Sequence, residues 1–496
     1  MGMTIAFCHN NTYAEAVEYT FVILSSSLDC NLVVKKEFTI SSEMESVVVS
    51  YGPEIPSNIG QNHLHIFADL SFWENFGKPE SFPKVPMYRI PLRQLELTPN
   101  EKLEDPLICP YLHRDNKSKP VYWTSSGPKD RRVLICEFDV LASAFFWLTR
   151  YEEAFNQGQD EFGCLPEHHL LSVRENCYSR PLVDEYVEVL RQLLNHFDCQ
   201  LGDKREPFRV LITHDVDSGI PLRGGLEYFK NGLRSFCREV CRERRLRAGL
   251  INCFQWFAIG AGLRSYIDSF ANILQIDNRY GYTSHFFLMA NGTNPKDAKY
   301  NIESEQSQRL IQKISLAGGH IGLHLGLDSH KNHYQFNNEW SSLRAVFPDI
   351  LPASRSHYLV FQVPDTWNKL SEVGCRVDTS LGFNECVGFR AGTSRPFRPF
   401  DVINHRILTI WEYPLTLMDI NLFVLPVRSD RRRIDEAYRV IDKVAAQGGC
   451  LVINWHNAYF YSDYLSMYLA ILNYVVTRGV DIRLADAPEP DHKLIW

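Results

Sequence analysis

Short aliphatic runs alternate with helical patterns through the C-terminal part of this chain, from residue 209 onward. Helical patterns such as Glu305–Ala317 and Arg433–Ala446 separate runs that are continuous enough for strands buried on both faces. We expect seven such strands: 209–213, 284–289, 320–325, 376–379, 407–411, 451–455 and 481–484. Strand–helix alternation is typical of a parallel sheet closed, or nearly closed, into a barrel. The pattern therefore predicts an α/β fold with an irregular (β/α) barrel.

The first 200 residues have a different pattern. Strand-like runs at Tyr19–Leu24 and Val47–Tyr51 precede helical patterns at Val140–Phe155 and Val183–Phe197. A polar link, Gly202–Pro207, follows the last of these helices. Because 496 residues are too many for one ordinary core, we predict two domains. These are an N-terminal α/β domain of unknown role over residues 1–203 and the barrel over residues 204–496.

Composition limits the classes of partner. A formal net charge of -7, with 45% hydrophobic and 22% charged residues, predicts a globular protein that does not bind nucleic acid. No apolar run approaches the ~20 residues that span a bilayer. The N-terminus has no secretion signal and the 13 cysteines form no CxxC pair, so we expect a cytoplasmic location. The basic insertion at residues 224–249 is interpreted as a solvated helical face; peripheral membrane contact is the alternative.

The strand candidate at Val210–Asp217 (VLITHDVD) ends in ionisable side chains. Side chains alternate along an extended strand, so Asp215 and Asp217 point to the same side. Two adjacent carboxylates repel each other unless a cation lies between them or one takes a proton. This pair suits a metal site in which one Asp binds the ion and the other acts as a base. An Asp-rich turn after a strand is the structural alternative.

Two further strand candidates end in histidine, a common ligand for divalent metals. One ends at His324, with Asp328 one helical turn beyond it, and the other is followed by His456. Arg355 and Arg390 are candidates to pair with a strand-end carboxylate. Each feature alone fits an ordinary structural role. Together, three strands deliver Asp, Asp, His and His to one rim, which predicts a catalytic site there.

With these motifs in order, residues 208 to about 490 resemble the polysaccharide deacetylase family with the NodB-homology domain. The match is to the branch whose first motif reads Thr-His-Asp-Val-Asp. Residues 1–203, with the motifs Leu148–Glu153 and Arg180–Glu185, look like the uncharacterised domain that often precedes this branch. The resemblance implies a distorted (β/α) barrel that hydrolyses acetyl groups from amino sugars or sugar hydroxyls with a divalent metal.

The resemblance also implies individual roles. Asp215 matches the general base, Asp217 and His324 match metal ligands, Arg355 matches the arginine that orients the base, and His456 matches the general acid. The chain departs from the family where the second histidine of a His-x-x-x-His motif is expected. Asp328 stands at that position and is our predicted third ligand, with His330 and His357 as alternatives.

The expected ion is zinc, with cobalt, nickel or manganese as alternatives. His357, Arg390 and Trp455 are predicted to bind substrate. The predicted substrate is an acetylated sugar or glycan precursor, because a finished wall polymer does not fit a cytoplasmic enzyme. Hydrolysis of a ureide or formamide, and glycan binding without catalysis, are the alternative functions.

Overall fold

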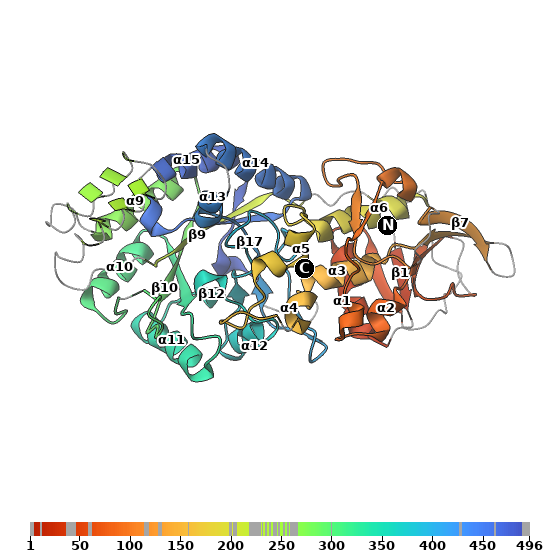
Figure 1. The fold of residues 1–496 in the computed structure, drawn as a ribbon, viewed down its shortest axis with the longest axis horizontal. Coiled ribbons are helices and arrows are strands. Elements are labelled where there is room, and N and C mark those ends of the chain that lie inside the picture. Colours follow the sequence, from red (N-terminus) through yellow and green to blue (C-terminus); the bar gives the residue numbers. More distant parts are fainter. Residues whose placement is uncertain are drawn as a thin grey trace.

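The computed structural model describes residues 4–9, 12–35, 46–57, 62–113, 119–126, 131–156, 158–197, 201, 206–217, 266–298, 300–425, 429–460 and 463–488, with scattered positions between 230 and 257. Two sheets organise these residues, one from each part of the chain. Figure 1 shows them in two lobes, with helices α3 to α5 between them.

The N-terminal sheet has six strands in the order β2-β1-β3-β4-β8-β7. All neighbours are parallel except β7, which is antiparallel to β8. The strands are β1 (Thr4–His9), β2 (Asn31–Lys35), β3 (Ser46–Gly52), β4 (His63–Phe67), β7 (Val121–Ser126) and β8 (Arg131–Cys136). A separate antiparallel pair is formed by β5 (Tyr88–Ile90) and β6 (Leu107–Cys109).

The helices of this half are α1 (Ala14–Ser26), α2 (Leu70–Glu74), α3 (Val140–Leu148), α4 (Tyr151–Phe155), α5 (Leu171–Arg174) and α6 (Leu182–Asn195). The predicted strand at Tyr19–Leu24 is wrong, because this run lies inside α1. Most side chains of α1 are buried, and periodicity cannot distinguish a short buried helix from a strand. The predicted helix Val140–Phe155 divides into α3 and α4 at Arg150, whose φ is 52°.

The second sheet has nine strands, with β16-β13-β12-β11-β10-β9-β18-β17 in order and β19 pairing with β9; all its ladders are parallel. The strands are β9 (Arg209–Asp215), β10 (Ser284–Met289), β11 (His320–Leu325), β12 (Ala353–Ser356), β13 (Val377–Asp378), β16 (Trp411–Glu412), β17 (Leu415–Met418), β18 (Cys450–Asn454) and β19 (Val480–Asp481). Only residues 413 and 414 separate the edge strands β16 and β17, and the three Cα–Cα steps from Glu412 to Leu415 span at most ~11 Å. The sheet must therefore curl back on itself, which confirms the expected α/β fold with a barrel-like parallel sheet.

Two predicted strands are only partly correct. The run 407–411 is not one strand, because β15 (Arg406–Ile407) pairs with β14 (Phe400–Asp401) in a separate antiparallel ladder and only Trp411 reaches the barrel sheet. The run 481–484 overlaps β19 and then enters a short 3-10 helix at Leu484. Strands β12 and β17 were not expected from the sequence.

The described helices of this half are α9 (Tyr266–Arg279), α10 (Glu305–Leu316), α11 (His333–Val346), α12 (Asp365–Glu372), α13 (Asp419–Val424), α14 (Asp430–Gln447) and α15 (Asp463–Val475). Ser304 and Ser429 cap α10 and α14 through their hydroxyls, and α14 ends at Gly448 in the left-handed conformation. Helices therefore occupy both regions where the sequence predicts them.

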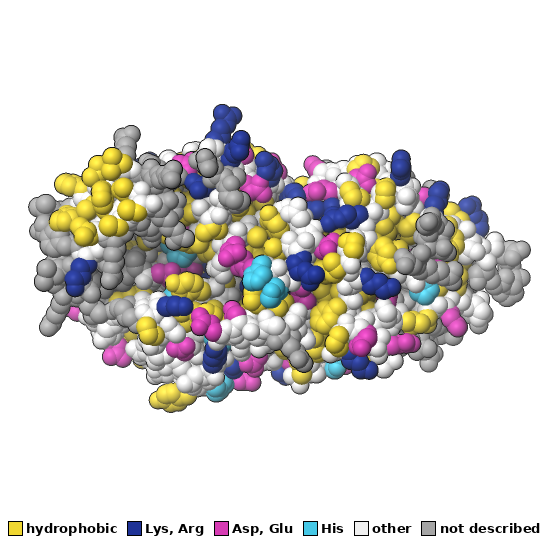
Figure 2. Space-filling model, in the orientation of Figure 1, with side chains coloured by type: hydrophobic (Ala, Val, Ile, Leu, Met, Phe, Trp, Pro, Cys, Tyr) yellow, Lys and Arg dark blue, Asp and Glu magenta, His cyan; other side chains and the backbone are white. Residues whose placement is uncertain are grey.

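Most of the basic insertion, residues 224–249, lies outside the described residues. At the positions described there and just beyond, Leu246, Leu250 and Phe254 are exposed. Figure 2 shows hydrophobic side chains gathered at this end of the molecule. No helix of the described part is long and apolar enough to cross a bilayer.

Candidate metal centre

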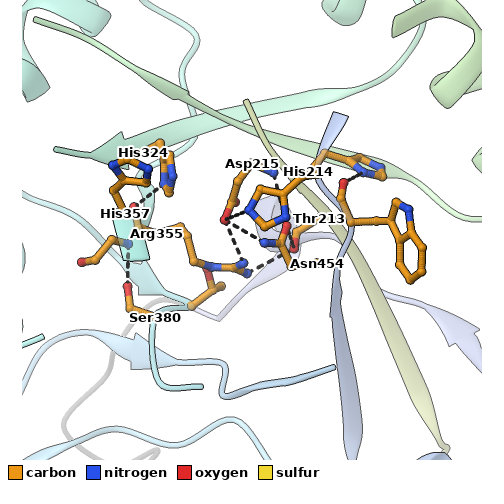
Figure 3. A network of polar contacts seen from close by, with 12 residues as sticks. Thr213, His214, Asp215, His324, Arg355, His357, Ser380 and Asn454 are labelled. Carbon is orange, nitrogen blue, oxygen red and sulfur yellow. Dashed lines mark hydrogen bonds and ion pairs between the residues drawn. The ribbon is translucent and has the colours of Figure 1, made fainter. Parts of the chain in front are cut away.

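The carboxyl ends of four strands of the barrel sheet bring most of the predicted site residues together. Asp215 ends β9 and Asp217 follows it, His324 lies in β11, Arg355 lies in β12, and His456 follows β18. The register places His324 beside Arg355 (Figure 3). A hollow of about 310 Å³ opens over them, lined by Asp215, Asp217, His324, Ser356, His357, Tyr358, Leu359, Asn384, Met418, Ile420, His456, Ala458 and Tyr459.

Asp217, His324 and His357 form a cluster whose potential ligand atoms all lie within 4.8 Å of one another. His324 Nε2 is 3.0 Å from Asp217 Oδ1, and His357 Nε2 is 3.8 Å from Asp217 Oδ2. Apart from this contact with each other, Asp217 Oδ1 and His324 Nε2 are buried without a hydrogen-bond partner among the described residues. In a tetrahedral zinc site, with bonds near 2.0–2.1 Å, adjacent ligand atoms are about 3.3 Å apart. The donor set and its spacing therefore fit a divalent cation.

The Nδ1 atoms of both cluster histidines are occupied, which leaves Nε2 facing the cluster. His324 Nδ1 is 2.9 Å from the Arg355 carbonyl oxygen, so it must donate its proton there. His357 Nδ1 is 2.9 Å from Asp297 Oδ1. Asp297 also accepts backbone N–H bonds from Leu327 and Asn294, and these donors fix the carboxylate. Partners of this kind set the tautomer and orientation of metal-binding histidines.

The structure does not bring Asp328 into the cluster. Its carboxylate accepts a hydrogen bond from Asn294 Nδ2 instead, because the chain turns directly after β11 and does not continue as a helix. His330 is also outside the cluster, with its Nε2 bonded to the Phe162 carbonyl oxygen. His357, which was predicted to bind substrate and was also an alternative ligand, takes the third position.

Asp215 lies beside the cluster and is held from two directions. Its Oδ2 accepts a hydrogen bond of 2.7 Å from Asn454 Nδ2 and lies 3.6 Å from Arg355 Nη1. The Arg355 guanidinium is fully buried, and it donates to Thr379 Oγ1 and Thr213 Oγ1 (Figure 3). The arginine is thus fixed in place, with its guanidinium next to the Asp215 carboxylate.

His456 lies beside both Asp215 and Asp217. Its Nε2 is 3.4 Å from Asp217 Oδ2 and 3.9 Å from Asp215 Oδ2, and its Nδ1 is 2.7 Å from Asp419 Oδ1. Burial disfavours the imidazolium, but the Asp419 and Asp217 carboxylates outweigh it and hold the pKa of His456 well above its usual range. Nε2, the ring nitrogen that is not bonded to Asp419, is the one near the two aspartates, and His456 lines the hollow.

Two residues predicted to bind substrate do not line this hollow. Arg390 is buried in a two-pronged ion pair with Glu153, 2.6 Å at its shorter contact, and it donates a further bond to the Gly382 carbonyl. Trp455 is fully buried in the core, and its carbonyl oxygen pairs with His214 Nδ1. Trp455 directly precedes His456, so in the extended chain its side chain points to the opposite side.

Two residues of the site, Asp297 and Asn454, were not predicted from the sequence. Asp297 lies far from His357 in the chain and has no motif of its own. Asn454 does have a signal, because it stands two residues before His456 at the end of a strand and so shares its side.

The comparisons with known proteins give limited similarity. The sequence model of a family of unknown function, DUF7033, matches residues 4–198. No curated protein shows a significant match to the chain. Among solved structures, a Mycobacterium smegmatis protein classed as a polysaccharide deacetylase is 14% identical, with a TM-score of 0.37 over 56% of this chain and 86% of that one. The carbohydrate deacetylase Agd3 is 7% identical, with a TM-score of 0.36 over 97% of this chain and 86% of that one. Likenesses of this size do not define an activity for this chain.

Proposed function

We propose that this chain is a metal-dependent hydrolase that removes an acetyl group from an amino sugar or glycan precursor. One observation carries the proposal. The Asp217–His324–His357 cluster lies beside a carboxylate held by Arg355 and Asn454 and a histidine held by Asp419, and the carboxylate and this histidine are 3.9 Å apart. A cation site with both a candidate base and a candidate acid beside it suits metal-assisted hydrolysis.

Each residue of the site has a separate role in the proposed reaction. A divalent ion held by Asp217, His324 and His357 would supply Lewis acidity for an acyl carbonyl. Asp215 takes the proton of the attacking water, and Arg355 and Asn454 keep its carboxylate in position. His456 gives a proton to the departing amine or alcohol through Nε2, while Asp419 stabilises the imidazolium from Nδ1.

The lining of the hollow favours an acetylated sugar. Leu359, Met418 and Ile420 form an apolar wall beside the cluster, which suits the acetyl methyl group. Tyr358 and Tyr459 lie in the same lining, and aromatic rings offer an apolar face and a polar tip to a sugar ring. The motif resemblance to polysaccharide deacetylases points to the same substrate class.

The test is acetate release from N-acetylated glucosamine and its oligomers by the zinc-loaded full chain, with Asp215→Asn beside it. Loss of the base should lower kcat by about 10²–10⁴-fold. Bound zinc should be unchanged, because Asp215 is outside the cluster. Asp442→Asn, which alters an exposed carboxylate on α14, is the matched control and should keep full activity. A chelator should abolish the rate and added zinc should restore it; full acetate release from Asp215→Asn would refute the assignment.

A further inference from the structure

A second hollow of about 270 Å³ adjoins the candidate metal centre. The two hollows share Tyr358, Leu359 and Asn384 in their linings. The far wall of the second hollow comes from residues 160–168, which belong to the N-terminal half of the chain. A substrate bound at the metal centre can therefore extend over Tyr358 toward the N-terminal half. Together the hollows fall within the ~300–1,000 Å³ range of small-molecule sites.

The N-terminal wall is fixed to the barrel by several bonds. The Phe162 carbonyl oxygen accepts bonds from Gln362 Nε2 and His330 Nε2, and the Phe361 N–H points at Cys164 Sγ. Lys331 Nζ donates to the Glu161 carbonyl oxygen. These contacts join residues more than 160 positions apart in the chain, so the segment is a built part of the rim and not a loop that happens to lie near it.

Glu167 connects this wall to the aromatic residue between the hollows. Its two carboxylate oxygens accept the backbone N–H groups of Asn384 and Glu385, and Asn384 Nδ2 donates a 2.9 Å bond to the Tyr358 carbonyl oxygen. Tyr358 has φ 54° and ψ 18°, a left-handed conformation that a bulky residue adopts only where its surroundings impose it. The Tyr358 side chain is 55% exposed and its ring centroid is 4.4 Å from that of His357.

The charges of the second hollow exclude a strongly anionic ligand. Its lining includes the carboxylates of Asp160, Glu167 and Glu385 against the cations Lys296 and Arg390. Arg390 is already neutralised by Glu153, and Lys296 lies over the Phe162 ring, 5.2 Å from its centroid. A phosphate group in this hollow would therefore lie near more carboxylates than available cations. A neutral ring with hydroxyl groups and apolar C–H faces fits Tyr358, Phe162 and these carboxylates.

We propose, building on the proposed function, that the second hollow binds a further neutral sugar unit of the substrate. The enzyme then acts on an oligosaccharide, and the N-terminal segment 158–169 supplies part of its specificity. A nucleotide-diphosphate sugar, whose charge would lie in this hollow, is a poor substrate.

The experiment compares N-acetylglucosamine, N,N′-diacetylchitobiose and UDP-N-acetylglucosamine as substrates of the zinc-loaded full chain. The disaccharide should have at least tenfold higher kcat/KM than the other two. Phe162→Ala and Tyr358→Ala should each lower the ratio of disaccharide to monosaccharide kcat/KM on the order of tenfold. His169→Ala changes an exposed residue of the same segment outside the lining and should leave that ratio unchanged.

Calorimetric binding to Asp215→Asn separates the two proposals. One outcome is that no substrate releases acetate, that the disaccharide binds more tightly than the monosaccharide, and that Phe162→Ala removes this difference in affinity. In that case the subsite is supported and the deacetylase proposal fails. If acetate is released with a ratio that both variants leave unchanged, or fastest from the UDP-sugar, the subsite is overturned and the hydrolase stands. Absence of both acetate release and preferential disaccharide binding overturns both.

Discussion

Asp297 decides which nitrogen of His357 faces the cluster. Its carboxylate receives the Nδ1 proton, so Nε2 keeps its lone pair toward Asp217. We expect Asp297→Ala to weaken zinc binding by about 10–100-fold. The His357 ring would lose the partner that fixes its orientation and tautomer and that makes Nε2 more basic. Competition with a chromophoric chelator measures the affinity, and circular dichroism checks that the fold is retained.

Asp328→Ala provides the matched comparison. The sequence motif assigns this residue to the metal, whereas the structure places it against Asn294. The variant should keep the zinc affinity of the unmodified chain. Equal losses in Asp297→Ala and Asp328→Ala would contradict the ligand set built on His357.

Asp419 bonds to Nδ1 of His456, as Asp297 bonds to Nδ1 of His357. It accepts from the His456 backbone N–H through Oδ2, and its Oδ1 is bonded to the ring. We expect Asp419→Asn to lower kcat on the order of 10–10²-fold, because the amide no longer stabilises the imidazolium. Zinc affinity should stay unchanged, since Asp419 is outside the cluster. A variant with reduced zinc binding and normal kcat at saturating metal would argue that Asp419 acts on the ligands instead.

At the scale of elements, apolar runs in the sequence predicted β9, β11 and β18, the strands that carry or directly precede Asp215, His324 and His456. They could not predict β12, whose four buried residues are Ala353, Ser354, Arg355 and Ser356. Here burial is achieved by hydrogen bonds, such as Ser354 Oγ to Asp378 Oδ1, and not by aliphatic side chains. His357 directly follows this strand, so the strand that hydrophobicity cannot detect is the one that positions the third residue of the cluster.

The wrong prediction of a strand at Tyr19–Leu24, inside α1, has a different cause. Thr20, Phe21 and Ile23 favour strands in isolation, but they are buried in a helix packed against α3 and α6. Tertiary packing decided the element, and the local pattern did not contain that information. The division of the predicted helix at Arg150 is also tertiary, because this residue turns its side chain into the contact between the two halves.

Helix α4 carries Glu153 into that contact, between Arg150 and Arg390. Burial raises the pKa of this carboxyl, but the two arginines outweigh it and lower the pKa to about 2. The unfolded chain has the ordinary, higher value, so this stabilisation is present above that value and is lost as the pH falls toward about 2.

Glu153→Gln should therefore lower the free energy of unfolding by about 3–5 kcal/mol at pH 7, because buried Arg390 loses the Glu153 charge and buried Arg150 keeps only its longer contact with Glu152. The difference from the unmodified chain should shrink as the pH falls from about 5 to about 3. Urea unfolding at several pH values measures it. Glu305→Gln, which removes one exposed ion pair on α10, should change stability by less than about 1 kcal/mol at every pH. A deficit that does not depend on pH would contradict the assignment.

At the scale of the whole molecule, the two sheets share their interior. One continuous hydrophobic cluster includes Val49 of the N-terminal sheet and Leu288 of the barrel sheet. Polar contacts follow the same boundary, where Tyr19 donates to the Arg398 carbonyl oxygen and Asp184 accepts from Thr393 and Ser394. The domain boundary at residue 203 stays a prediction. These contacts indicate that the N-terminal half and the barrel are not independently stable.

Asp184→Ala tests this coupling. The substitution leaves the Thr393 hydroxyl and the Ser394 N–H and hydroxyl without their buried acceptor, which should cost about 3 kcal/mol. If the halves unfold as one unit, amide exchange should accelerate by about the same factor, on the order of 10²-fold, in β3 and in β10. Hydrogen–deuterium exchange resolved by peptide measures both strands in one sample. Faster exchange in β10 with β3 unchanged would show that the halves unfold separately, and the N-terminal wall of the substrate site would then be free to detach without unfolding the barrel.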